Sequence, residues 1–170
     1  KTVFIEPLHS GKMFIHWVRR IEYFSVFYIF YLSISSMKQI KILLVAALLV
    51  LAGINIYGFG QKYLEWAVYS TMNREFSKGW LLVLTEHARV NSSFGGHYDL
   101  AAYLAMTLPI LLAFLFGVSY KIFAQKLRFF ALLLFIGNFW LLILTAARIS
   151  FAAYLVGVSV VLLLLKKRTL

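Results

Sequence analysis

Five apolar segments, each long enough to cross or nearly cross a membrane, constrain this chain most. They cover roughly residues 21–36, 40–57, 100–120, 129–146 and 149–165. About 20 helical residues span a hydrocarbon core of about 30 Å, whereas open strands would leave backbone amides unpaired in lipid. The sequence therefore predicts an all-α, polytopic membrane bundle of about five transmembrane helices, forming a single transmembrane domain over residues 1–170.

The composition supports a membrane protein and narrows its partners. The chain is 62% hydrophobic with only 14% charged residues, which is too apolar for a soluble domain of 170 residues. Its net charge of +11 favours membrane lipids or an anionic substrate as partners. We do not expect nucleic acid as a partner, since no basic stripe alternates with stacking aromatics on a soluble surface. The absence of cysteine excludes disulfides and thiolate metal sites.

The last two apolar segments must form a hairpin. Residues 129–165 are almost continuously apolar and contain no proline, so a single helix there would be about 55 Å long. The polar residues near its middle are Thr145, Arg148 and Ser150. We therefore place the turn at these residues, which draws Arg148 toward the apolar layer.

Basic residues in the short loops predict which side of the membrane each loop occupies. If all five segments cross, one side, the cytoplasm, receives eight of them: Lys38, Lys41, Lys121, Lys126, Arg128, Lys166, Lys167 and Arg168. The opposite side receives an outer loop, residues 58–98, and the turn at Arg148. Lys12, Arg19 and Arg20 also fall on that outer side, against the rule. Either the first segment does not fully span, or these cations are retained there for a purpose.

Two arginines distant in sequence, Arg89 and Arg148, are thus expected on the outer face. A guanidinium stays charged and binds phosphate oxygens through two parallel hydrogen bonds, so two of them suit a diphosphate. Alternatively, each snorkels to the headgroups or caps a helix carbonyl. An intramembrane charge is costly without a partner, which favours a function for Arg148 in particular.

The residues just before the third span also suit an anion. Gly95 and Gly96 allow close backbone approach, and a helix beginning near Asp99 directs free amides toward the same place. In an extended lead-in, His97 and Asp99 project to the same side, so Asp99 could orient His97 or an arginine. Asp99 is equally suited to capping the helix. We include these four residues with the two arginines as candidate diphosphate-binding residues.

The outer loop between the second and third spans is rich in aromatic and basic residues. These are Tyr63, Trp66, Tyr69, Phe76, Trp80, Lys62, Arg74 and Lys78. They could stack on sugar rings and bind acidic groups, or the loop could lie flat in the membrane interface with a short amphipathic helix. The sequence has no metal-ligand spacing or phosphate loop, so we expect no metal and no other cofactor.

Two stretches together resemble the O-antigen ligase and polymerase-like membrane proteins of bacteria. The first is RVNSSFGGHYDLAAYLAMTLPILLAFL, which follows that family's pattern of an arginine, a glycine-rich turn, a polar triplet and an apolar span. The second is LTAARISFAAYL, with a threonine and small residues before an arginine. The resemblance covers residues 89–165. It departs from the family at 97–99, where His-Tyr-Asp replaces a more usual Asn-Pro-Asn.

The resemblance implies a metal-independent glycosyltransferase in the bacterial cytoplasmic membrane. Its donor would be a polyprenyl-diphosphate-linked glycan, its acceptor a glycan or lipid on the outer face, and Arg89 and Arg148 would hold the diphosphate. The family's presumed catalytic histidine lies in a downstream outer loop, so His97 is only a fallback. We expect the chain to be a piece of a longer protein and inactive alone. Alternatives are a transporter or flippase for lipid-linked glycans, or a non-catalytic membrane assembly subunit.

Overall fold

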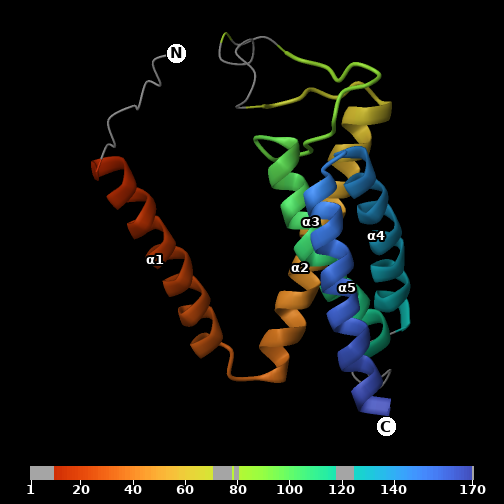
Figure 1. Ribbon diagram of the computed structural model, residues 1–170. Helices are drawn as coiled ribbons and strands as arrows, with labels where there is room; N and C mark the ends of the chain where they lie inside the picture. Colours follow the sequence, from red (N-terminus) through yellow and green to blue (C-terminus); the bar gives the residue numbers. More distant parts are fainter. Residues whose placement is uncertain (1–9, 71–77, 79–80, 118–124, 170) are drawn as a thin grey trace. The chain divides into compact units, whose positions relative to one another are not determined.

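The structure is a computed structural model that describes residues 10–70, 78, 81–117 and 125–169 (Figure 1). Its regular elements are helices, apart from an isolated antiparallel bridge between Val68 and Leu82. The helices are α1 (Ser10–Ser33), α2 (Met37–Tyr63), α3 (His97–Gly117), α4 (Gln125–Leu144) and α5 (Arg148–Thr169). The predicted all-α class is confirmed.

Four of these helices, α2 to α5, are long and apolar enough to cross a membrane, so the chain is a multi-pass membrane protein. The exception is α1, although a span was expected at 21–36. Arg19, Arg20 and Glu22 interrupt α1 near its middle, and the apolar stretch after them ends with the helix at Ser33. That stretch is shorter than the roughly 20 residues that a crossing requires.

A capping box precedes α2 in the link from α1. In this motif, side chains bind the free amides at the start of a helix. The side-chain oxygen of Gln39 accepts hydrogen bonds from the amides of Ser35 and Ser36, at 2.9 and 3.1 Å. In return, the hydroxyl of Ser36 accepts the amide hydrogen of Gln39 at 3.3 Å. The break between the two helices is therefore encoded locally by Ser-Met-Lys-Gln.

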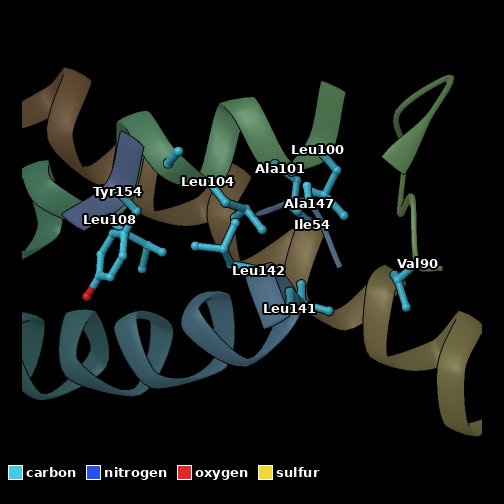
Figure 2. Close-up of a cluster of buried hydrophobic side chains, with 11 residues drawn as sticks. Ile54, Val90, Leu100, Ala101, Leu104, Leu108, Leu141, Leu142, Ala147 and Tyr154 are labelled. Atoms are coloured by element: carbon cyan, nitrogen blue, oxygen red, sulfur yellow. The ribbon is translucent and has the colours of Figure 1, made fainter. Parts of the chain in front are cut away.

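The chain forms two compact units, residues 1–45 and 46–170, with the boundary inside α2. In the second unit, α3 packs against both α4 and α5. Buried side chains from all four helices and from Val90 form its core, and Figure 2 shows Ala147 near Leu100, and Tyr154 near Leu108. Through Val90, this core holds the end of the segment 64–96 that leads into α3 against the helices.

Helices α3 and α5 run parallel in a fixed register. A Cβ added to Gly157 would lie 2.8 Å from Cγ of Pro109, and one added to Gly117 would lie 2.9 Å from Leu165. Together with the pair Ala147 and Leu100 in the core, these contacts keep a nearly constant offset along both helices. Small residues at helix contacts allow this close approach in membranes. Pro109, inside α3, supplies the ring on which Gly157 packs.

Glycines also set the contact between α2 and α4. A Cβ on Gly58 would meet Leu141 at 2.9 Å, and one on Gly137 would meet the side-chain oxygen of Asn55 at 2.5 Å. The outer loop was expected to begin at residue 58. It begins at residue 64 instead, because Gly58 and Gly60 serve helix packing and α2 continues to Tyr63.

Two amide side chains, Asn55 and Asn138, are buried between these helices. Nδ2 of Asn138 donates to the Leu134 carbonyl of its own helix at 2.8 Å. Nδ2 of Asn55 and Oδ1 of Asn138 have no partner among the described residues. Trp140 does bridge helices, since its Nε1 donates to the Tyr63 hydroxyl at 3.0 Å.

The glycine contact between α3 and α5 can be tested with Gly157→Ala. The added methyl group would press on the rigid Pro109 ring, so we expect unfolding in detergent to become easier by about 1–3 kcal/mol. The matched control is Gly53→Ala, because a Cβ there has nothing within 4 Å. Equal stability of the two variants would contradict the proposed register.

Candidate functional site

The candidate site lies at one end of the second unit. There α2 and α4 end and α3 and α5 begin (Figure 1). Near this end Ile54, Val90, Leu100 and Ala147 share one buried cluster (Figure 2). Arg89 directly precedes Val90, and Arg148 directly follows Ala147. The structure thus places both arginines at the same end of one bundle, although they belong to different elements.

The loop that carries Arg89 is fixed to α2 by a reciprocal pair of hydrogen bonds. The amide of Ser92 donates to Oε1 of Gln61 at 2.8 Å, and Nε2 of Gln61 donates to the Ser92 carbonyl at 3.0 Å. The Ser92 hydroxyl also donates to the Ile54 carbonyl at 2.8 Å. Both side chains are almost fully buried, and Ser92 adopts a positive φ of 50°. This pairing holds an otherwise unfavourable backbone turn in place.

Asn91 fixes the turn that leads into α3. Its Nδ2 donates to the carbonyls of Tyr69 and Phe94, each at 2.8 Å, and its own carbonyl accepts the Phe94 amide. The Ser70 hydroxyl donates to the Gly95 carbonyl at 3.2 Å. The segment before α3 is therefore tied to both α2 and the outer loop.

Arg89 contacts His97, the first residue of α3. Nη1 of Arg89 lies 3.0 Å from Nε2 of His97. Because a guanidinium can only donate, Nε2 must accept, which requires a neutral imidazole with its proton on Nδ1. Arg89 is solvent-exposed, and it forms no ion pair with any residue in the described ranges. Its guanidinium therefore keeps other donors available for an anion.

The local structure around Asp99 differs from the sequence-based expectation. The helix begins at His97, and the Leu100 amide donates to the Gly96 carbonyl at 3.3 Å. Asp99 is therefore the third helical residue and not the cap. Residues two apart in a helix do not face each other, so His97 and Asp99 do not project together as an extended strand would require. Asp99 still lies in the first turn, where a carboxylate interacts favourably with the helix dipole.

Arg148 is the first residue of α5, directly after a tight turn. Ala146 has a positive φ of 52°, and the Thr145 hydroxyl donates to the Leu142 carbonyl at 2.7 Å. Arg148 is exposed, and it forms no hydrogen bond or ion pair with the described part of the chain. A cation at a helix N-terminus is disfavoured by the helix dipole. Local stability therefore does not explain this arginine.

Trp66 of the aromatic outer segment has a structural role, as does Tyr57 of α2. Trp66 packs so closely on Gly60 that a Cβ there would lie 2.2 Å from the indole ring. The Tyr57 hydroxyl donates to the Ala67 carbonyl at 2.8 Å. Tyr63 and Tyr69 remain exposed. Arg74, Phe76 and Trp80 lie outside the described residues, as does most of the segment where a short amphipathic helix was considered.

Sequence reasoning missed three residues that build this end: Gln61, Asn91 and Ser92. Nothing in their spacing indicates that a glutamine in a GFGQKY stretch binds a serine 31 positions later. Within the described ranges, no three His, Asp or Glu side chains gather as a metal site would require. Comparison with protein-family models, curated proteins and solved structures finds no match for this chain.

The role of Gln61 can be tested with Gln61→Ala. This change leaves the buried amide and carbonyl of Ser92 without their partners, each worth about 1–3 kcal/mol. We expect faster hydrogen exchange at the Ser92 amide and earlier proteolysis within residues 64–96. The control is Gln125→Ala, at an exposed glutamine that begins α4. Unchanged exchange at Ser92 in the Gln61 variant would show that the pair does not fix the loop.

Proposed function

We propose that this chain binds the diphosphate of a polyprenyl-linked glycan through Arg89 and Arg148, as part of a membrane glycosyltransferase of the O-antigen ligase or polymerase type. The observation that carries this proposal is the placement of two exposed arginines at one end of a membrane bundle. Neither is neutralised by a carboxylate from the described residues. A diphosphate at a membrane surface offers the charge and the paired oxygens that two guanidinium groups bind well.

The way each arginine is held supports a joint role. Arg89 is attached through Val90 to the Gln61 and Ser92 pair, and Arg148 is attached through Ala147 to the core. Both backbones are therefore fixed, while the Arg148 side chain is exposed and the Arg89 side chain is held only through one nitrogen by His97. The first amides of α3 and of α5 also carry partial positive charge, which adds to an anion-attracting field.

In such an enzyme the acceptor hydroxyl oxygen would form a bond to the anomeric carbon of the donor. The bond from that carbon to the diphosphate oxygen breaks, and the diphosphate leaves with the electron pair. Arg89 and Arg148 would stabilise its developing charge. A base must take the proton of the acceptor hydroxyl.

His97 is poorly placed to be that base while it contacts Arg89. The lone pair of Nε2 accepts from the guanidinium, and Nδ1 carries the proton, so neither nitrogen can take up another. If Arg89 turned toward a bound diphosphate, Nε2 would be released. The more consistent role for His97 in this proposal is to hold Arg89 in place before the donor arrives.

The proposal is tested by measuring the binding of undecaprenyl diphosphate to the chain in lipid nanodiscs. Arg148→Lys keeps the charge and loses the paired donors, so we expect affinity to fall about tenfold or more. Arg148→Gln should weaken binding further.

The control for charge removal is Lys126→Gln, in the first turn of α4 at the opposite end of the unit. It should leave affinity unchanged. Undecaprenyl monophosphate should bind more weakly than the diphosphate and respond less to Arg148→Lys. Full affinity in a folded Arg148→Gln variant would remove the proposal.

A further inference from the structure

Helix α1 separates its polar and apolar residues more strongly than the other helices do. Over residues 14–24, five apolar residues recur at helical spacing, and all are solvent-exposed: Phe14, Trp17, Val18, Ile21 and Phe24. The rings of Phe14 and Trp17 stack at 6.5 Å. A continuous apolar face of this kind requires a partner.

The cations of α1 identify the chemistry of that partner. Positions 12 and 19 fall on the opposite side of the helix from this apolar face, and Arg20 lies at its edge. The residues there are Lys12, Arg19 and Arg20, against one acid, Glu22. A basic polar face beside a face rich in Trp, Phe and Ile is the pattern of a helix lying in the interface of an anionic membrane.

The second half of α1 is apolar on all sides. Phe27, Ile29, Phe30 and Leu32 are all more than half exposed within the described residues. About ten such residues cover about 15 Å, roughly half of the hydrocarbon core. This half can enter one leaflet but cannot reach the other side.

A crossing α1 would also conflict with the distribution of positive charge. It would place Lys12, Arg19 and Arg20 on the side opposite to Lys38 and Lys41. If α1 stays on the side where α2 begins, all these cations share one side, as the positive-inside rule requires.

We infer that α1 does not cross the membrane but lies in the leaflet on the side of Lys38 and Lys41, with its basic positions toward anionic lipid headgroups. The binding partner of α1 is thus the anionic lipid of that leaflet. This inference is independent of the diphosphate proposal, since it concerns residues 10–33 and the other concerns the end of the second unit.

The absence of cysteine makes the side of α1 directly measurable. Single variants Gly11→Cys, Lys38→Cys and His87→Cys are each labelled uniquely by an impermeant maleimide applied to sealed vesicles of known orientation. We expect Gly11→Cys to be labelled from the same side as Lys38→Cys. Labelling from the side of His87→Cys would mean that α1 crosses, and would overturn the inference.

Spin labels placed one at a time over residues 14–24 test the orientation of α1. Labels at 14, 17, 21 and 24 should be more accessible to oxygen than to a water-soluble nickel reagent. Labels on the opposite, polar face of the helix, such as position 19, should be more accessible to the nickel reagent. Equal access to water all round the helix would overturn a surface position.

Lipid composition tests the anionic partner. Each basic residue near an anionic membrane surface strengthens binding to that surface by about fivefold. The double change Arg19→Gln and Arg20→Gln should therefore shift a label at Val18 toward water in vesicles containing phosphatidylglycerol, and much less in pure phosphatidylcholine. The control is Glu22→Gln, which should not shift the label toward water. Equal shifts in both lipids would contradict the anionic part of the inference.

Discussion

The interaction on which the candidate site depends is the hydrogen-bonded pair between Gln61 and Ser92. One glutamine side chain uses both its oxygen and its nitrogen to satisfy the backbone of a residue 31 positions later. A buried amide or carbonyl without a partner is costly. Separating Gln61 from Ser92 would therefore lose the two hydrogen bonds and also leave the buried polar groups of Ser92 unpaired. The contact stabilises the positive φ of Ser92, a conformation that residues other than glycine rarely adopt. Together with the Asn91 hydrogen bonds and the buried Val90, it holds the backbone on which Arg89 stands.

The position of Arg148 depends on a different kind of contact, the close packing of α5 on α3. Hydrophobic association is weak between helices already surrounded by lipid, so shape complementarity determines which helices meet. Gly157 on Pro109, and Gly117 on Leu165, allow the two backbones to approach and set their register. That register fixes where α5 begins, and hence the level of Arg148 relative to the start of α3. Hydrogen bonds thus hold one arginine and van der Waals packing holds the other.

The structural features that could be predicted from the sequence are those that the thickness of the bilayer determines. A 37-residue apolar run cannot be one transmembrane helix, so its length predicts a turn, and the polar residues Thr145, Arg148 and Ser150 indicate where that turn lies. The end of α2 could not, because Gly58 and Gly60 are typical of a loop until Leu141 and Trp66 are known to pack on them. The same holds for Gln61 and Ser92, whose partners are defined only by the tertiary fold. The start of α3 was predicted two residues too late, near Asp99 instead of at His97, because glycine, serine and aspartate can each precede the first turn of a helix.

One shared anionic ligand explains both arginines, whereas neither is explained by its own local contacts. Arg148 alone is a cation at a helix N-terminus, where the dipole repels it. Arg89 alone is held by a neutral histidine, which contributes an acceptor but no charge. Among the described residues, Glu86 and Asp99 are the acidic side chains nearest in sequence to Arg89, and neither forms an ion pair with either arginine. Excess positive charge at a fixed place is electrostatically unfavourable in the free protein, and an anion that bridges both guanidinium groups would remove the imbalance. Lipid headgroups could screen each arginine singly, but a diphosphate supplies enough oxygen acceptors for both at once.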